Sequence, residues 1–567
     1  MRLRARLQRS IRAAWGALVA IDLLSRATWL APRLATTRGA LNYGAAVIAL
    51  LLVLRLLAMA PRRRRVWLFA VFVSVPMAIQ FAVFRAYGQF VEPTDFVAFF
   101  ESPRVVLFAA WSGADRLGMI AVFVVSLATA WIMPKEKRPL RVWWIGLAGA
   151  TLATAFGIGA TYWRASPSLA HAQPAFLSAA VGLLPRTTIR ARQGRRVVVP
   201  PAPANEPLPN IVLVVGESLA ASHLTLYGYE RDTTPRLQKI ADRGEAIVMR
   251  DAVVVGPHTR TSVPYILTGL EGPDPDGRVF GAPTILAYAK ARGYHTAFVS
   301  AQEESWGSLD ALFREGADIF RTGIQFAPDV DVLKGADDLV VLEKGVLPAL
   351  DTLREPFFLV VHMDGSHIPY GHHSPASHKV FVPEEGVNSI RAYDNSVRVT
   401  DEFLARTFDK LHARDPNAWM FFTSDHGQAL GEGGAFFNRG YQLNVVRDPL
   451  LVFLPKDTDR APWHALSPAQ VSACDVAPTI LHLMKTAPAP SAPMDCANWL
   501  DGPPVARVRV VSAYTPTYVT EPTMLVVLPD GARRVYHLGQ GNVTLDDGSI
   551  LPIGDRPLPD RVAARLR

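Results

Sequence analysis

The first 165 residues alternate long apolar runs with clusters of basic residues, and no other feature of the sequence constrains the fold as strongly. A run of about 20 apolar residues crosses a bilayer as a helix, because the hydrocarbon core holds no water to satisfy the backbone. Four runs reach that length, at about 39–60, 66–87, 117–133 and 142–163. The sequence therefore predicts an N-terminal helical membrane domain over residues 1–164.

A fifth run, at about 13–31, is interrupted by Asp22 and Arg26. Their i,i+4 spacing places them on one face of a helix, where their charges can neutralise each other. With this run the membrane domain has about five spans. An amphipathic helix that lies on the membrane surface is the alternative for these residues.

The basic residues flank the apolar runs and predict the topology. Residues 1–65 contain 13 Arg, no Lys and one acid, which gives +12, whereas the remaining 502 residues carry −3. Two spans separate the clusters at 62–65 and 135–141, so both can lie in the cytoplasm, where basic loops are favoured. We therefore expect a multi-pass protein of the inner (cytoplasmic) membrane that exports everything after about residue 164 to the periplasmic side. A nucleic-acid partner is excluded, because it would need a basic patch on a folded domain.

Residues 165–209 form a predicted connector between the membrane and the exported part. The apolar stretch 176–184 is followed by several arginines, which indicates a juxtamembrane helix on the membrane surface, with packing on the folded domain as the alternative. The proline-rich stretch 200–209 predicts a stiff, polyproline-like spacer.

The sequence has two cysteines, Cys474 and Cys496, which excludes a cysteine-rich zinc scaffold or a dense set of disulfides. Both lie in the exported part, where an oxidising compartment favours a disulfide. Two buried thiols are the alternative, because spacing says nothing about whether the side chains meet.

The pattern changes at Asn210 to short apolar runs that alternate with helical segments. This alternation predicts an α/β domain over residues 210–567 with a largely parallel central sheet. We expect strands at 211–215, 296–300, 357–362, 419–423 and 450–454, with helices at 235–243 and 389–412. In such sheets the chemistry gathers beyond the carboxyl ends of the strands.

Four strand ends carry acids, hydroxyls or imidazoles, often beside a glycine. They are Gly216-Glu217-Ser218, Gly256-Pro257-His258-Thr259-Arg260-Thr261-Ser262 after Val253–Val255, Gly365-Ser366-His367, and Ser424-Asp425-His426-Gly427. Glu217, Asp425 and His426 together offer the oxygen and nitrogen ligands of a hydrolytic zinc centre. The sequence therefore predicts a metal site at this edge of the sheet.

Several motifs resemble those of membrane phosphoethanolamine transferases, a branch of the sulfatase and alkaline-phosphatase superfamily. The matching pieces are Asn210–Ser218, Leu226–Pro235, Thr259 with Ser262-Val263-Pro264, His362-Met363-Asp364-Gly365-Ser366-His367, Tyr393-Asp394-Asn395 and Ser424–Gly427. Their order fits, and so does a membrane anchor of five spans. The resemblance implies the sulfatase-like fold and a divergent relation to the members that modify lipid A.

The resemblance also identifies the nucleophile. Transferases of this type place a threonine three residues before Ser-Val-Pro. Sulfatases place their modified cysteine or serine ten residues before the glycine of Leu-Thr-Gly. Both counts lead to Thr259. A sulfatase would need cysteine or serine there, with arginine where this chain has Val263, so sulfate-ester hydrolysis by that route is not expected. Thr261 and Ser262 are the alternative nucleophiles.

The resemblance implies a metal-dependent transfer of phosphoethanolamine from a membrane phospholipid, phosphatidylethanolamine, to an envelope acceptor such as lipid A, lipopolysaccharide or another glycan. Thr259 becomes phosphorylated and is also a metal ligand, and His367 contacts the phosphoryl group or carries a proton. One zinc ion is expected, with a second as an alternative because five histidines lie between residues 362 and 378. Of these, His372, His373 and His378 are expected on the surface or against the acceptor. No oligomer is implied.

The sequence departs from the family pattern near the site. Gln428 stands where a glutamate is usual, and Asn438 lies near the position of a further histidine. The stretch 300–307 replaces a cysteine-rich loop, with Gln302 and Trp306 as expected substrate contacts. His362 and His258 are further candidates for substrate binding.

These departures leave other functions open. A phosphoglycerol transferase that acts on a glucan or a teichoic-acid-like polymer would use the same site. A membrane-anchored phosphoester hydrolase is a third reading, although many hydrolases of the superfamily carry paired aspartates where this chain has Gly216-Glu217. The last alternative function is that of a non-catalytic scaffold.

Overall fold

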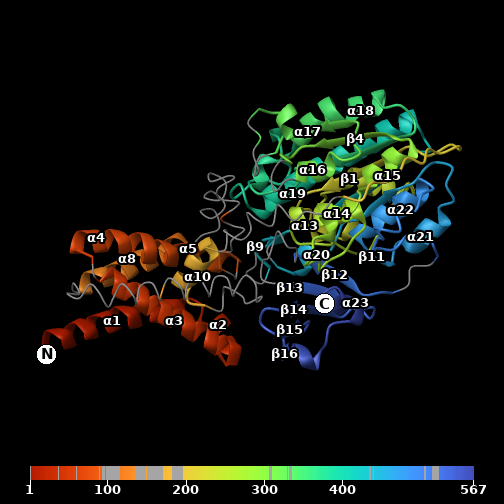
Figure 1. Ribbon diagram of the computed structural model, residues 1–567. Coiled ribbons are helices and arrows are strands. Elements are labelled where there is room, and N and C mark those ends of the chain that lie inside the picture. Colours follow the sequence, from red (N-terminus) through yellow and green to blue (C-terminus); the bar gives the residue numbers. More distant parts are fainter. Residues whose placement is uncertain are drawn as a thin grey trace.

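The computed structural model describes most of the chain. The described residues are 2–35, 37–58, 60–87, 90–91, 96, 115–133, 149, 170–181, 196–304, 309–328, 330, 335–432, 436–438, 440–502, 506–513 and 523–566. Figure 1 shows the helical N-terminal part, from α1 to α10, beside the larger α/β part that contains the sheet.

The N-terminal part is helical throughout its described elements. They are α1 (Arg2–Ser25), α2 (Ala27–Leu34), α3 (Thr37–Leu57), α4 (Arg62–Phe69), which continues through a π turn (Ala70–Ser74) into α5 (Val75–Tyr87), α8 (Arg116–Ile132) and α10 (Ala172–Val181). Two stretches are long and apolar enough to cross a membrane, Ala40–Leu57 and Arg62–Arg85, and Arg116–Trp131 is a shorter apolar helix. The run at 142–163 lies outside the described residues apart from Gly149. The number of five spans therefore stays a prediction.

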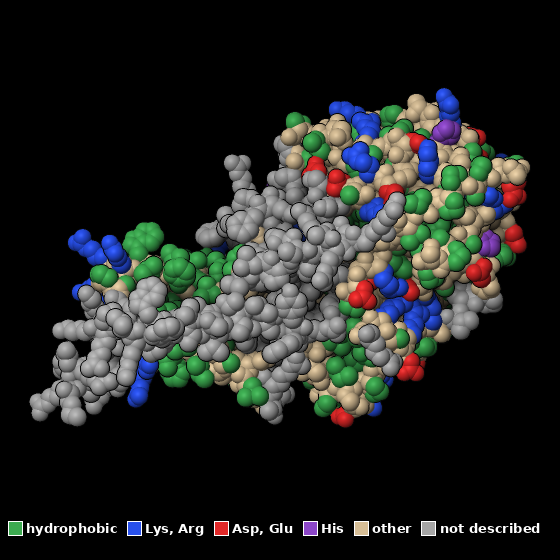
Figure 2. All heavy atoms as spheres, in the orientation of Figure 1, with side chains coloured by type: hydrophobic (Ala, Val, Ile, Leu, Met, Phe, Trp, Pro, Cys, Tyr) green, Lys and Arg blue, Asp and Glu red, His purple; other side chains and the backbone are tan. Residues whose placement is uncertain are grey.

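The surface of this helical part is apolar where a bilayer would cover it. Large side chains point outward, including Trp67 (75% exposed), Leu117 (83%) and Trp131 (60%). Figure 2 shows apolar side chains over these helices and basic side chains at the end where α4 begins. Exposed apolar side chains of this size are unfavourable in water and favourable in lipid.

Asp22 and Arg26 neutralise each other, as their spacing predicts. Their side chains are buried and 2.8 Å apart. Tyr43 O–H on α3 donates to Asp22 Oδ2 (2.9 Å), and the backbone N–H of Ala172 donates to Asp22 Oδ1 (3.2 Å). Because a buried charge is tolerated only when paired and hydrogen-bonded, this cluster joins α1, α3 and the start of α10. Helix α10 also packs on α3 and α5.

The α/β part is built on a seven-stranded sheet with the order β2-β10-β7-β1-β6-β4-β5. The strands are β1 (Ile211–Gly216), β2 (Ala246–Val248), β4 (His295–Ser300), β5 (Ile319–Arg321), β6 (Phe357–His362), β7 (Trp419–Ser424) and β10 (Leu451–Phe453). From β7 to β5 neighbouring strands are parallel, whereas β10 is antiparallel to both β7 and β2. The sheet is therefore mixed, with a parallel block that contains the central strands.

Both faces of the sheet are covered, so its strands are buried on both sides. Along β1, Ile211 and Leu213 pack toward α13 (Thr259–Thr268), α15 (Ile285–Arg292) and α22 (Val476–Leu483). Val212 and Val214 pack toward α12 (Pro235–Asp242), α17 (Asp338–Val341), α18 (Leu347–Thr352) and α19 (Ile390–Arg414). This alternation follows from the two-residue period of a strand. It explains why the sequence shows continuous apolar runs, as for parallel sheets in α/β proteins.

Three further sheets lie outside the central one among the described residues, and the smallest pairs β8 (Ala429–Leu430) with β9 (Phe436–Phe437). The stretch expected as a strand at 253–255 instead contributes β3 (Asp251–Val253), which pairs with β11 (Gln470–Ser472) in a two-stranded sheet. The expectation that this stretch is a strand of the central sheet is wrong. Strands β10 and β2 form the edge of that sheet beyond β7 instead. A five-stranded antiparallel sheet near the C-terminus was not predicted from the sequence. Its strands are β12 (Arg509–Ser512), β13 (Thr523–Val527), β14 (Arg533–His537), β15 (Asn542–Leu545) and β16 (Ile550–Pro552).

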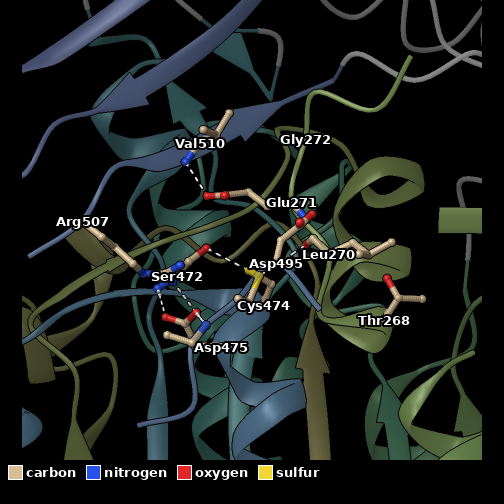
Figure 3. Close-up of a disulfide and its surroundings, with 12 residues drawn as sticks. Thr268, Leu270, Glu271, Gly272, Ser472, Cys474, Asp475, Asp495, Arg507 and Val510 are labelled. Atoms are coloured by element: carbon tan, nitrogen blue, oxygen red, sulfur yellow. Dashed lines mark hydrogen bonds and ion pairs between the residues drawn. A yellow bond between two sulfur atoms is a disulfide. The ribbon is translucent and has the colours of Figure 1, made fainter. Parts of the chain in front are cut away.

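Cys474 and Cys496 form a disulfide, as expected for an oxidising compartment. Figure 3 shows it beside Asp475, whose Oδ2 accepts from the backbone N–H of Ser472 (2.9 Å) and which pairs with Arg507. Nearby, the backbone N–H of Val510 on β12 donates to Glu271 (2.8 Å). The disulfide therefore ties the start of α22 to the segment that leads into the C-terminal sheet.

The proline-rich connector does not stand free as a spacer. Its backbone donates hydrogen bonds to the α/β part from Val197 to Gly281 O (2.9 Å) and from Ala202 to Ala291 O (2.8 Å). Lys485 pairs with Glu206 at 2.6 Å. Residues 196–209 therefore belong structurally to the α/β part, although the sequence boundary at 210 is set by the change in pattern.

We expect a soluble fragment of residues 196–567 to be more stable than one of residues 210–567. Each lost backbone hydrogen bond is worth about 0.5–1.5 kcal/mol, so the difference should be about 1–3 kcal/mol. Urea unfolding of the two fragments measures it. Equal midpoints and slopes would show that the connector contributes nothing to the fold.

Replacing both cysteines by serine should lower the unfolding free energy of the α/β part. The bridge closes a loop with a sequence separation of 22 residues. For a loop of that size the expected loss is about 3 kcal/mol, measured by thermal unfolding with and without reductant. Thiol labelling of the native protein under denaturing, non-reducing conditions is the control, and two labelled thiols would contradict the bridge.

Candidate metal centre

Two neighbouring strands bring the acidic residues of the site together. Strands β1 and β7 are paired in register, so that Gly216 lies beside Ser424. The residues that follow, Glu217 and Asp425, therefore leave the sheet at the same edge. Both are buried, at 1% and 0% exposure, because the strands before them lie in the core.

The turn after β6 packs directly on this edge. Gly365 has a φ of +56°, and a Cβ atom there would lie 2.5 Å from the carbonyl oxygen of Glu217. The backbone N–H of Ser366 donates to that oxygen (3.0 Å). A glycine is thus required for the chain to pass behind Glu217 and to carry His367 to the site.

Thr259 reaches the site from the first turn of α13. Its Oγ1 donates to Glu217 Oε2 at 2.9 Å and lies 3.5 Å from His426 Nε2. The alternative nucleophiles make no described hydrogen bond to the acids: Thr261 Oγ1 donates to the carbonyl oxygen of His258 (2.9 Å), and Ser262 Oγ is buried without a hydrogen-bond partner among the described residues. The backbone N–H groups at the start of a helix favour anions, so Thr259 lies where a phosphoryl group would be stabilised.

The Leu226–Pro235 motif and the Tyr393-Asp394 motif hold the loop after β1 in place. Tyr393 O–H donates to the carbonyl oxygen of Ser218 and accepts from the backbone N–H of Ala220, both at 2.7 Å. Asp394 accepts from Tyr229 O–H (3.0 Å) and contacts His223 at 2.7 Å. These buried polar contacts hold the loop that begins with Glu217, so the motifs support the site without lining it.

The cluster of Glu217, Asp425 and His426 has the geometry of a metal-binding site. One ligand atom from each residue lies within 4.8 Å of the others. Asp425 Oδ1 accepts from the backbone N–H groups of Ser218 (3.0 Å) and His426 (2.6 Å), whereas its buried Oδ2 has no hydrogen-bond partner among the described residues. A buried carboxylate oxygen without a partner is costly unless a cation meets it. The residues present therefore fit a zinc ion.

The electrostatics of the cluster also fit a cation. Burial and the adjacent Glu217 carboxylate raise the pKa of Asp425 well above its usual range. Burial lowers the pKa of His426, and its Nδ1 lies 2.8 Å from the carbonyl oxygen of Gly427, which leaves Nε2 as a lone-pair donor. Two buried carboxylates can both ionise only if a positive charge lies between them.

The other predicted residues lie around this cluster in different roles. Gln302 Nε2 donates to Glu217 Oε2 (3.1 Å) and to the carbonyl oxygen of Met363 (2.9 Å), so it contacts a candidate ligand. His362 is fully buried behind Gln302, with Nδ1 2.7 Å from Glu304 Oε1. Asn438 Nδ2 lies 3.0 Å from His426 Nε2.

Three predicted residues remain. His367 is half-buried, with Nδ1 3.0 Å from the carbonyl oxygen of Ile368, and it is close enough for its charge to lower the pKa of His426. His258 is the residue before α13. Trp306 lies outside the described residues.

The histidine-rich stretch does not form a second metal cluster among the described residues. His372 is exposed, and His378 pairs with Glu402 at 3.1 Å. His373 differs from the expectation of a surface residue, because it pairs with Asp364 and its side chain is 9% exposed. Asp364 lies inside His-Met-Asp-Gly-Ser-His, but the sequence carries no signal that pairs it with His373.

Comparison with known proteins defines the class of fold. Residues 209–486 match the family model described as Sulfatase. The integral membrane protein lipooligosaccharide phosphoethanolamine transferase A (EptA) from Neisseria meningitidis has the same fold, with a TM-score of 0.60 and 17% identity. The match covers 84% of this chain and 95% of that chain.

Curated relatives narrow the resemblance within this class. The Kdo(2)-lipid A phosphoethanolamine 7''-transferase of Salmonella typhimurium is 26% identical over 275 residues, which is 45% of this chain and 46% of that protein. Phosphoethanolamine transferase EptA of Helicobacter pylori is 29% identical over 267 residues, which is 43% and 48%. The chain thus spans less than half the length of these relatives. The expected resemblance to phosphoethanolamine transferases is confirmed.

We expect the full-length protein in detergent to hold about one zinc ion per chain, as a three-ligand catalytic centre does. Glu217→Gln and Asp425→Asn should each weaken zinc binding by at least about 10-fold, because each removes an anionic ligand. Thr259→Ala should keep most of the metal, since the other three ligands remain. Elemental analysis and competition with a chelator measure this.

The matched control is Glu385→Gln, an exposed carboxylate whose side chain is 60% exposed and paired with Arg391. It should bind zinc like the unaltered protein. A folded protein that holds no divalent metal after zinc loading would contradict the assignment of the centre.

Proposed function

We propose that this chain is an integral-membrane transferase that moves phosphoethanolamine from a phospholipid to an envelope acceptor. The observation that carries the proposal is the hydroxyl of Thr259, 2.9 Å from Glu217 Oε2 in a buried cluster of two acids and a histidine at the start of a helix. The relatives named as phosphoethanolamine transferases support this substrate class. The lipid donor is phosphatidylethanolamine, and the acceptor is lipid A, lipopolysaccharide or another glycan.

The first half of the proposed reaction loads Thr259. Thr259 Oγ1 attacks the phosphorus of the donor in line, its bond to phosphorus forms, and the bond from phosphorus to the diacylglycerol oxygen breaks. A zinc ion held by Glu217, Asp425 and His426 would lower the pKa of the hydroxyl and neutralise charge on the phosphoryl oxygens. Glu217 Oε2 already accepts the hydroxyl hydrogen bond, so it orients the oxygen and takes the proton that Thr259 loses. His367 supplies the proton to the leaving oxygen.

The second half returns the enzyme to its starting state. A hydroxyl or phosphate oxygen of the acceptor attacks the phosphorus, and the bond from phosphorus to Thr259 Oγ1 breaks. His367, which gave up its proton in the first half, takes the proton of an acceptor hydroxyl, and Thr259 regains its own proton from Glu217. The N–H groups at the start of α13 stabilise the oxygens in both halves.

The proposed placement in the cell has the domain boundaries 1–164, 165–209 and 210–567, with the α/β part on the periplasmic side of the inner membrane. Two observations support it. The described helices include two stretches apolar enough to cross a membrane. The α/β part carries a disulfide, which persists in oxidising compartments.

Thr259→Ala should abolish transfer, because it removes the atom that forms the covalent adduct, and Thr259→Ser should retain part of the activity. His367→Asn should slow transfer by about 10²–10⁴-fold, the usual value of acid–base help. The measurement is mass spectrometry of the protein after incubation with phosphatidylethanolamine, which locates the adduct, and of envelope lipids and glycans from cells with and without the gene.

Thr261→Ala is the matched control on the same helix and should retain the adduct. An adduct on Thr261 or Ser262 would contradict the assignment of the nucleophile. Release of phosphoethanolamine to water alone would favour the hydrolase, and transfer of phosphoglycerol would favour the alternative donor.

A further inference from the structure

The loop after β6 contains a buried carboxylate–imidazole pair that the proposed reaction leaves unused. His373 Nδ1 lies 3.1 Å from Asp364 Oδ2, and the two side chains are only 9% and 6% exposed. The backbone N–H of Gly335 also donates to Asp364 Oδ2 (3.1 Å). The carboxylate is thus held in place, and it fixes the orientation of the ring through Nδ1.

The other ring nitrogen, Nε2, has no comparable partner among the described residues. His373 Nε2 is buried and has no hydrogen-bond partner among the described residues. A buried polar nitrogen that is left unpaired costs free energy, and such atoms are rare in native proteins. At the edge of a candidate active site, a ligand atom is the natural partner.

The imidazole contacts Asp364, the residue before Gly365, and Gly365 packs on the backbone of Glu217. Burial lowers the pKa of His373, but the charges of Asp364, Asp338 and Glu217 outweigh it and raise the pKa overall. Glu217 thus acts electrostatically on the ring. Gln428, two residues after His426, donates to Tyr370 O–H (2.7 Å) and holds the same loop against the centre.

Asp338 fixes the start of this loop. Its carboxylate accepts from the backbone N–H groups of Asp364 (2.9 Å) and Gly365 (2.8 Å). The position of Asp364, and with it that of His373, is therefore set by a buried group at the start of α17 and does not depend on a surface side chain.

We propose that His373 is a substrate-binding residue whose Nε2–H donates a hydrogen bond to an anionic phosphate oxygen of the substrate, with Asp364 as the residue that positions the ring. The inference rests on the proposed function, since it names a contact of that same site. The phosphate belongs either to the phospholipid donor or to the acceptor. Both present the same chemistry, an oxygen with negative charge.

If His373 had only a structural role, its substitutions would have different effects, so experiment can distinguish the two roles. The pair also joins the two ends of the loop that carries His367, and such a clasp needs Nδ1 alone. Asparagine places its amide nitrogen near the position of Nδ1, and glutamine places its own near Nε2. His373→Asn therefore keeps the clasp and deletes the substrate contact, whereas His373→Gln does the opposite.

The first measurement is the binding of O-phosphoethanolamine to the zinc-loaded full-length protein in detergent, by calorimetry. His373→Asn should raise the Kd by about 10–100-fold, because it removes a charge-assisted hydrogen bond. His373→Gln should be clearly milder. His372→Asn, at the exposed neighbouring position, is the control and should leave the Kd unchanged, and zinc content and thermal midpoint report on the fold of each variant.

The second measurement separates the two sources of the phosphate. If the donor phosphate is bound, His373→Asn slows formation of the Thr259 adduct; if the acceptor phosphate is bound, it slows only the loss of the adduct to the acceptor. Either result supports the inference. A wild-type protein that binds O-phosphoethanolamine through His373 but forms no adduct would contradict the proposed function and leave the inference standing.

Three results would overturn the inference. One is a His373→Asn protein equal to wild type while His373→Gln is impaired, which is the signature of a clasp. Another is an equal loss in both variants. The third is the absence of measurable O-phosphoethanolamine binding by the wild-type protein.

Discussion

The site depends on two carboxylates that are buried side by side. Glu217 and Asp425 follow paired strands, and the register of β1 and β7 forces them to leave the sheet at the same edge. Neither can move to solvent, because the strands before them are fully buried. In a medium of low dielectric constant both carboxylates can ionise only beside a cation, and Asp425 Oδ2 has no hydrogen-bond partner among the described residues. The fold thus creates a site whose residues fit a metal ion.

The surrounding groups extend this arrangement outward. Thr259 is held by Glu217 at the start of α13, where backbone N–H groups favour phosphate oxygens. The turn at Gly365 passes against Glu217, and Asp364 in the same turn pairs with His373. Each of these elements touches the backbone or side chain of Glu217, so a change at this residue would disturb the nucleophile and the loop together.

Much of the fold and the centre could be predicted because both leave local signals. Buried strands give continuous apolar runs, and the polar residues directly after them mark the active edge of the sheet. Asp22 and Arg26 could be paired because helical spacing is a local property. The antiparallel C-terminal sheet and the place of β3 could not be predicted, because strand pairing joins residues far apart in the chain and follows no short-range rule.

The sequence by itself determined the two-part organisation, the strands that end in Glu217 and Asp425, and Thr259 as the candidate nucleophile once the motifs were compared. These follow from hydrophobic periodicity and from residue types at strand ends. Only the tertiary structure decided that the proline-rich connector packs on the α/β part, that His362 is buried, and that His373 pairs with Asp364 at the edge of the centre. Burial and pairing of a single side chain depend on which distant elements cover it, and that information is absent from local sequence.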